Sequence, residues 1–166
     1  MTTRGARRVV IMGVSGSCKT AVGSALAARL GWRFIDADDL HSPANIAKMS
    51  GGVRLTDQDR GPWLAAVARQ LASDGDEIAA CSALRRPYRN TIADAVPRVF
   101  FVHLTVPPAT LAARMRTREG HFMPSSLRSR SLAGEVAECD RCMWPYSIDA
   151  VTGVRAAICG CRTADR

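Results

Sequence analysis

Long apolar runs are missing from this sequence of 166 residues. A membrane-spanning helix needs about 20 consecutive apolar residues, and no run in the chain approaches that length. The apolar stretch VVIMGV follows a basic N-terminus but has only six residues, which is too short for the hydrophobic region of a signal peptide. We therefore expect no membrane partner and a cytoplasmic location.

Aromatic residues and lysines are also scarce. Aromatics make up 5% of the chain, and Lys19 and Lys48 are the only lysines behind a net charge of +8. The positive charge comes from arginines spread along the chain, without the aromatic platforms on which nucleic-acid bases stack. Arginine binds phosphates and carboxylates through two parallel hydrogen bonds. The composition therefore favours small anionic ligands and argues against a nucleic-acid partner.

The spacing of a metal site is only partly present among the six cysteines. Cys139 and Cys142 form a C-x-x-C pair, whereas Cys159 and Cys161 are separated by one residue instead of the two typical of zinc sites. Cytoplasmic proteins rarely hold disulfides. Free thiols are the favoured interpretation, and a structural zinc site is the alternative.

Apolar periodicity predicts strands that alternate with helices. Short β-branched runs are typical of buried strands, and apolar residues at spacings of three and four are typical of helices. The predicted strands are 7–13, 32–36, 77–83 and 98–104, and the predicted helices are 20–30, 42–49, one around Trp63, Leu64, Val67 and Leu71 that ends near Gly75, and 108–118. The alternation indicates an α/β fold in which helices cover both faces of a parallel sheet. Without a dividing linker, residues 1–166 are expected to form a single domain.

The pattern weakens after about Leu127. Residues 146–151, YSIDAV, are predicted to form the last strand. Residues 151–158, VTGVRAAI, are predicted to form a short last helix.

A nucleotide-binding pattern lies between the first predicted strand and the first predicted helix. GVSGSCKT differs at one position from the phosphate-binding loop G-x-x-x-x-G-K-[ST]. In such a loop, backbone N–H groups and the following helix bind the phosphates, the lysine reaches the terminal phosphates of ATP, and the hydroxyl residue binds Mg²⁺. We assign nucleotide binding to the whole stretch: Gly13, Val14, Ser15, Gly16, Ser17, Cys18, Lys19 and Thr20. A chance Gly- and Ser-rich turn is the alternative.

Cys18 stands where this loop has its second glycine. Glycine adopts positive φ without strain and projects nothing toward the phosphates. Cysteine adds a Cβ and a sulfur but keeps its backbone N–H, so the loop loses no hydrogen-bond donor. The substitution therefore predicts a weakened phosphate site, not an abolished one.

Two aspartates follow the second predicted strand. Asp36 and Asp38 are two residues apart in the stretch DADDLH. Because ligands of open parallel sheets bind beyond the carboxyl ends of the strands, these carboxylates are expected to lie beside the loop. One would help to bind the metal, and the other would accept a proton from a hydroxyl nucleophile. A solvated acidic turn is the alternative, and His41 is more typical of a hydrogen-bonding turn residue than of a base.

Basic residues follow the third predicted strand, in the stretch CSALRRPYR. They are expected at the mouth of the same site, where they would bind a carboxylate or phosphate. The basic residues are Arg85, Arg86 and Arg89, and Arg60 in LTDQDRGPW is a similar candidate. Ser82 is expected at the same mouth. The alternative is a solvated basic helix face.

Arg114 and Arg118 lie four residues apart, on one face of the predicted helix 108–118. The Gly-containing turn after them is typical of a mobile lid that brings arginine onto a transferring phosphoryl group. A helix C-terminus that favours positive charge is the alternative.

Taken together, these stretches resemble the gluconate kinases of the shikimate-kinase-like P-loop group. The resemblance covers residues 8 to about 125 and rests on MGVSGSCKT, FIDADDLHSPANIAKMSGGVRLTDQDRGPWL, CSALRRPYR and REGHFMP. It implies a three-layer P-loop NTPase-like fold with a lid, and the phosphorylation of D-gluconate by ATP to 6-phosphogluconate. Members of the family are often dimers, so a homodimer is expected.

The resemblance also implies roles for individual residues. Asp38 would be the base on the acceptor hydroxyl, which leaves Asp36 and Thr20 for the metal. The catalytic set would be Lys19, Asp38 and Arg118, and the substrate contacts would be Asp38, His41, Arg60, Ser82, Arg85 and His121, with Arg118 and His121 in the lid.

Past Leu127 the resemblance fades, because RSRSLAGEVAECDRCMW is rich in arginine and cysteine and lacks the family's pattern. Two compensating reading-frame shifts in the gene and true divergence are the two explanations. Together with Cys18, this departure supports a second hypothesis, in which a catalytically weakened P-loop protein acts as a ligand-binding or regulatory module. A zinc-stabilised nucleic-acid binder is a third hypothesis.

Overall fold

A six-stranded sheet runs through the computed structural model, which describes residues 6–117, 145–147 and 155–159. Its strand order is β2-β3-β1-β4-β6-β5. The first four strands pair in parallel, and β6 and β5 extend the sheet in antiparallel pairing. The strands are β1 (Arg8–Met12), β2 (Arg33–Asp36), β3 (Glu77–Ala80), β4 (Val99–Thr105), β5 (Pro145–Ser147) and β6 (Arg155–Cys159).

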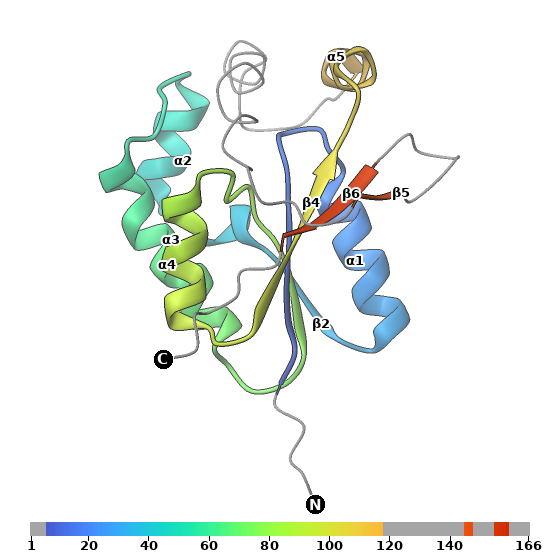
Figure 1. Ribbon diagram of the computed structural model, residues 1–166. Helices are drawn as coiled ribbons and strands as arrows, with labels where there is room; N and C mark the ends of the chain where they lie inside the picture. The colour runs from blue at the N-terminus through green and yellow to red at the C-terminus, as the bar shows by residue number, and fades with distance from the viewer. Residues whose placement is uncertain (1–5, 118–144, 148–154, 160–166) are drawn as a thin grey trace, which may run out of the picture.

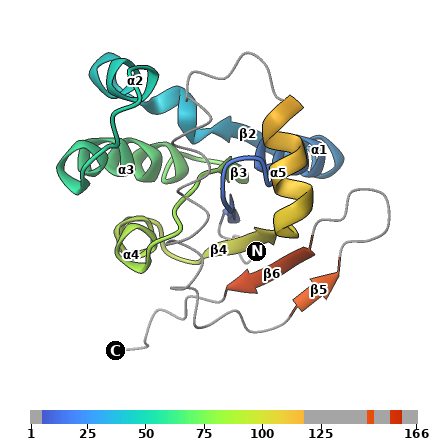
Figure 2. The ribbon, with the colours of Figure 1, turned by 90° about the horizontal axis from the view of Figure 1, so that it is seen from above.

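Helices cover both faces of the parallel part of the sheet, as Figures 1 and 2 show. Helix α1 lies on one face, and α3 and α4 lie on the other. The helices are α1 (Lys19–Leu30), α2 (Pro43–Ser50), α3 (Asp57–Leu71), α4 (Arg86–Ala95) and α5 (Pro108–Thr117), with a 3₁₀ turn, η1 (Ala37–Leu40), directly after β2. The predicted α/β architecture is confirmed, although α4 is not among the predicted helices.

Local sequence signals account for the helix ends. Gly31 ends α1 in a left-handed conformation, with φ 68°. The Ser42 hydroxyl accepts a hydrogen bond from the amide of Asn45 and so caps α2, whose first residue is a proline. Thr56 and Asp59 form a reciprocal capping box at the start of α3. These caps fix the residues at which α2 and α3 begin.

Two apolar clusters hold the layers together. Alternate residues of β4 point to opposite faces, so Phe101 packs among α3 and α4 while Leu104 packs with the α1 side. The larger cluster contains Leu71, Val67 and Ile92, each of which is fully buried. Burying these side chains is the main stabilising contribution to the sandwich of sheet and helices.

The C-terminal elements differ from the prediction. The predicted last strand, 146–151, overlaps β5, whose described residues are Pro145–Ser147. The predicted last helix over 151–158 is wrong, because Arg155–Cys159 is a strand that pairs with β4. An eight-residue pattern does not separate helix from strand by periodicity. The unpaired N–H and C=O groups along the edge of β4 decide between them, because β6 satisfies these groups by pairing.

Acidification should destabilise the protein through His103 on β4. This residue is buried, and burial together with the neighbouring Arg89 lowers its pKa below the ordinary value of 6.5. Below pH 6.5, His103 binds a proton more readily in the unfolded chain than in the folded one. The free energy of unfolding therefore falls as the pH falls. One such group contributes a slope of up to about 1.4 kcal/mol per pH unit. The free energy of unfolding, measured by denaturant titration at pH 7, 6 and 5, should fall less steeply in His103→Gln than in the wild type. Equal slopes would contradict this assignment.

Candidate active site

The candidate site lies at the carboxyl ends of β1, β2 and β3. Parallel pairing sets Ile11 beside Ala80 and Asp36 beside Ala80, so the segments that follow these three strands leave the sheet at one edge. The segments are the loop that begins at Gly13, the η1 turn after Asp36, and the chain after Cys81. This edge is where an open parallel sheet binds ligands.

The loop between β1 and α1 has the shape of a phosphate cradle. Gly13 has φ 153°, and a Cβ on it would lie 2.6 Å from the Ser17 Oγ and 2.7 Å from the Leu104 carbonyl oxygen, so only glycine fits there. The Ser17 Oγ is buried and has no hydrogen-bond partner among the described residues. The Lys19 Nζ donates to the Val14 carbonyl at 3.2 Å, which places the ammonium over the loop. A close-set backbone, an unpaired hydroxyl and a lysine fit a phosphate group.

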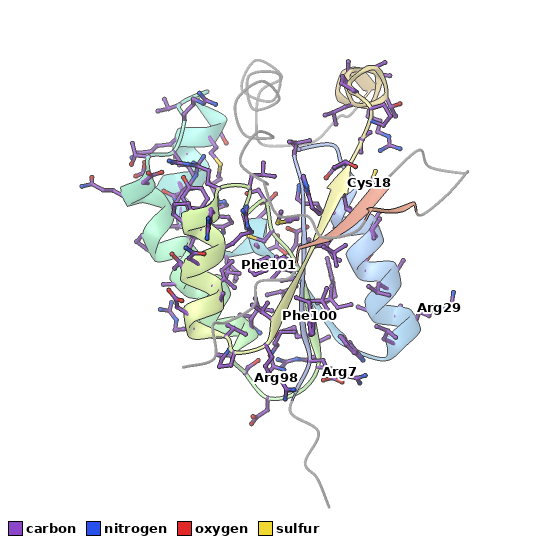
Figure 3. The ribbon with its side chains drawn as sticks, in the orientation of Figure 1. Arg7, Cys18, Arg29, Arg98, Phe100 and Phe101 are labelled. Atoms are coloured by element: carbon purple, nitrogen blue, oxygen red, sulfur yellow. The ribbon has the colours of Figure 1, made fainter. Side chains whose placement is uncertain are left out.

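Cys18 adopts the backbone conformation that favours glycine. It caps the N-terminus of α1 with φ 67° and ψ 29°, in the left-handed region, and its side chain makes no capping hydrogen bond. This conformation costs a residue with a Cβ roughly 1–2 kcal/mol. The sulfur lies 3.3 Å from the Nη1 of Arg114 on α5, and Figure 3 shows Cys18 at the end of α1 nearest α5. The thiol thus connects the loop with the last described helix.

Replacing Cys18 with glycine should tighten nucleotide binding. Cys18→Gly removes the strain of the left-handed backbone together with the sulfur, and the ATP dissociation constant should fall by about tenfold for each 1.4 kcal/mol that is relieved. Cys18→Ala is the matched control, because it removes the sulfur and keeps both the Cβ and the strain. Calorimetric titration with ATP measures all three proteins, and ATP should also protect wild-type Cys18 from alkylation. If Cys18→Gly binds ATP no better than the wild type, and alkylation ignores the nucleotide, residue 18 does not face the phosphates.

Thr20 and Asp36 meet beside the loop, as the predicted metal site requires. The Thr20 hydroxyl donates to the Asp36 Oδ2 at 2.6 Å, and the Asp36 Oδ1 accepts from the amide of Asp38 at 3.1 Å. Within the described part of the chain, no group of three or more His, Cys, Asp or Glu side chains could hold a metal ion. A hydroxyl and one carboxylate fit Mg²⁺, which keeps several waters and takes its other ligands from the phosphates of a nucleotide.

The η1 turn carries Asp38 and is held at both ends by Trp63 of α3. The indole Nε1 donates to the Ala37 carbonyl at 2.7 Å, and the indole ring stacks on the imidazole of His41, with ring centroids 4.4 Å apart. Burial lowers the pKa of His41, Asp38 opposes this effect, and Arg60 adds to it. The His41 Nδ1 is buried without a hydrogen-bond partner among the described residues. His41 thus stacks on Trp63, and its backbone N–H donates to the Asp38 carbonyl at 3.3 Å, as expected of a hydrogen-bonding turn residue.

The pKa of His41 should depend on the ring of Trp63. Trp63→Leu removes the stacked ring and exposes the imidazole, so the pKa should rise toward 6.5, its ordinary value. Trp63→Phe keeps an aromatic ring and should keep the pKa low. NMR titration of the His41 ring protons measures both variants, and identical titration curves would show that the stacking does not desolvate His41.

Arg60 and Arg85 converge on a second part of the site, around Tyr88 of α4. The Tyr88 hydroxyl accepts from the Arg60 Nη1 at 2.8 Å and from the Arg85 Nη1 at 3.3 Å. It donates to the Asp57 Oδ1 at 2.5 Å, and Arg85 also contacts Asp57 at 3.0 Å. The hydrogen bond from Tyr88, and then the charge of Arg85, lower the pKa of the Asp57 carboxyl. The two arginines predicted to contact substrate therefore lie together.

The other two arginines predicted after β3 differ in their exposure to solvent. Arg86 is exposed, whereas Arg89 is buried and donates to the carbonyl oxygens of Ala83 and Leu84. Arg89 thus shapes the chain after β3, and its predicted position at the mouth of the site is wrong. Ser82 is half-buried and follows Cys81, whose thiol pKa burial raises to about 12.

Several predicted residues lie outside the described ranges. These are Arg118 and His121 in the expected lid, and Cys139, Cys142 and Cys161 of the alternative zinc site. None of the described helices is long and apolar enough to cross a membrane.

The sequence patterns miss three residues that organise the site. Trp63 is predicted only as a core residue of its helix, and Asp57 and Tyr88 receive no predicted role. The available signal is spacing: Arg60 lies one helical turn after Asp57, and Tyr88 lies one turn after Arg85. The contact between the two pairs depends on the packing of α3 against α4.

Comparisons with known proteins agree on one group of kinases. Residues 15–143 match the shikimate kinase family model. A gluconokinase from Gluconobacter oxydans is 48% identical over 132 residues, which cover 76% of this chain and 74% of the relative. The crystal structure of an unliganded sugar kinase from Janibacter is 45% identical, covers 78% of both chains and has a TM-score of 0.73. That of a gluconokinase from Sinorhizobium meliloti is 49% identical, covers 78% of this chain and 74% of the other, and has a TM-score of 0.69.

Proposed function

This chain belongs to the gluconokinase family, within the shikimate kinase group, and from that premise we propose that it transfers the γ-phosphoryl group of ATP to D-gluconate, giving 6-phosphogluconate. One structural observation supports this reaction above the others. A continuous chain of hydrogen bonds runs from Thr20 at the phosphate loop through Asp36 to the backbone of Asp38. It links the residues proposed for the nucleotide to the residue proposed for the acceptor, and in-line phosphoryl transfer requires these two groups of residues to be adjacent.

On the nucleotide side, the loop from Gly13 to Thr20 would bind the phosphates of ATP. Lys19 would neutralise charge on the β- and γ-phosphates, while Thr20 and Asp36 would hold Mg²⁺. When bound, Mg²⁺ supplies further neutralisation of the phosphate oxygens. Because catalysis of this kind is mostly positioning and electrostatic stabilisation, the fixed placement of Lys19 and Asp36 is the main contribution of the fold.

On the acceptor side, Asp38 would orient the C6 hydroxyl of gluconate and accept its proton. The amide of Asp38 bonds to Asp36, so the position of the base is tied to the proposed metal site. Arg60 and Arg85 would bind the carboxylate at the opposite end of the sugar acid. His41 and Ser82 would contact the hydroxyl groups between these two ends. On the resemblance, Arg118 and His121 would approach from the lid.

The metal, the cellular location and the assembly proposed for this protein are those of a small metabolic kinase. We propose Mg²⁺ as the metal, the cytoplasm as the location and a homodimer as the assembly, with no nucleic-acid partner. The arginine-rich charge suits anionic metabolites, and the dimer rests on the family resemblance alone.

A catalytically weakened protein that binds its ligands without turnover is the second candidate. Two observations favour it: the left-handed backbone at Cys18, and the contact of Arg114 with the sulfur at the phosphate loop. A coupled assay that follows ADP release with gluconate and ATP separates the candidates. Turnover that depends on gluconate supports the kinase, and binding of both ligands without turnover supports the second candidate.

Asp38→Asn should lower kcat by roughly 10²–10⁴, the usual contribution of a general base, because an amide cannot accept the proton of the hydroxyl. ATP binding should persist, since the change leaves the phosphate loop intact. Asp39→Asn is the matched control, because Asp39 lies in the same turn and is exposed. Steady-state kinetics and ATP titration of both variants test the role, and a kcat of Asp38→Asn close to that of the wild type would exclude it.

A further inference from the structure

The Tyr88 hydroxyl uses its full hydrogen-bonding capacity on charged neighbours. A phenol has one proton to donate and lone pairs that can accept two hydrogen bonds. Here the proton goes to Asp57, and the lone pairs receive Arg60 and Arg85. Tyr88 is buried, with 8% of its surface exposed, so its ring and hydroxyl are held in place by α4. The hydroxyl therefore fixes two guanidinium groups relative to each other.

The guanidinium groups of Arg60 and Arg85 also lie against the Tyr88 ring. The Cζ atoms of both arginines lie 5.4 Å from the ring centroid, within the range of cation–π attraction. Arg60 comes from the first turns of α3, and Arg85 immediately precedes α4, so the two cations come from separate elements. Two positive charges that contact the same ring repel each other. The shared phenol and the carboxylate of Asp57 offset that repulsion.

The charge of this cluster suits one bound carboxylate. Two guanidinium groups and one carboxylate leave a single positive charge. Arg85 directs its Nη1 to Tyr88 and Asp57, and its remaining N–H groups donate to no described side chain or carbonyl. Among the described residues, the Arg60 guanidinium donates one hydrogen bond, from its Nη1 to the Tyr88 hydroxyl. The unused N–H groups are the donors that a carboxylate binds.

We propose that Tyr88 positions Arg60 and Arg85 as a clamp for the carboxylate of the acceptor, and that Asp57 limits the net charge of this clamp to +1. The proposal rests on the proposed function and goes beyond it, because it assigns a positioning residue and a charge-setting residue to the acceptor site. The clamp would recognise the negative charge of a sugar acid and discriminate against neutral sugars of the same shape.

Two variants should shift this discrimination in opposite directions. The measured quantity is the ratio of the affinities for D-gluconate and for D-gluconamide, which has the same shape without the charge. Tyr88→Phe removes the shared hydroxyl, so the ratio should fall by about tenfold, the effect expected for hydrogen bonds to charged groups. Asp57→Asn raises the net charge of the clamp to +2, so the ratio should rise several-fold and depend more steeply on salt.

Calorimetric titration of the full-length protein, with a non-hydrolysable ATP analogue present, measures these affinities without turnover. Thermal denaturation shows whether each variant folds, and Asp57→Asn changes an exposed side chain outside the core. In kinetics, Tyr88→Phe should raise KM for gluconate while kcat stays within about twofold, because a positioning residue for the carboxylate does not touch the reacting atoms.

Several results would overturn the clamp. These are equal binding of gluconate and gluconamide by the wild type, no binding of either, or a ratio that moves in the same direction in both variants. A fall in kcat without a change in KM for Tyr88→Phe would also overturn it. The proposed function fails separately: gluconate bound more tightly than gluconamide, but without turnover, would leave the clamp intact and exclude the kinase.

Discussion

The parallel pairing of β1, β3 and β2 is the constraint on which the site depends. Backbone hydrogen bonds fix the register of these strands, so the chain leaves all three at the same edge of the sheet. Residues far apart in sequence meet there, and the hydrogen bond from Thr20 to Asp36 spans 16 positions. A slip of one residue in β2 would turn Asp36 to the other face of the sheet and separate it from the phosphate loop. The proposed nucleotide and acceptor sides are therefore held together by the sheet, not by a flexible loop.

Cys18 shows how a local rule and a tertiary requirement conflict. The loop needs a left-handed residue at this position, and the chain supplies one with a Cβ. The strain is tolerated because the surrounding structure determines the loop: Gly13 allows the close approach of Ser17, and the amide of Val22 donates to the Cys18 carbonyl at 3.0 Å as α1 begins. The same sulfur contacts Arg114, so a departure from the usual loop has gained a partner on α5.

The proposed acceptor side is built by aromatic residues as much as by charged ones. Trp63 holds the turn that carries Asp38, and Tyr88 holds the two arginines that face the acceptor's carboxylate in the proposed reaction. Both aromatic side chains are buried, and each uses its polar group and its ring face to contact site residues. The Asp57 carboxylate offsets part of the positive charge of Arg60 and Arg85, and its contacts with Arg85 and Tyr88 help to hold the two arginines in place. Selectivity for a charged acceptor is thus proposed to arise from the contact between α3 and α4.

The sequence by itself determined the alternation of strands and helices, the phosphate loop, and the presence of Asp36, Asp38, Arg60 and Arg85 near one edge. Short-range rules suffice for these features, because periodicity, caps and loop spacing depend on neighbours in the chain. Only the tertiary structure decided that Arg89 is buried, that Arg155–Cys159 is a strand, and that Asp57 and Tyr88 join Arg60 and Arg85. Each of these outcomes depends on partners from other elements: the edge of β4 for the strand, and the packed surface between α3 and α4 for the cluster. A pattern along the chain contains no information on which distant groups will satisfy a hydrogen bond, and that information appears only when the layers pack.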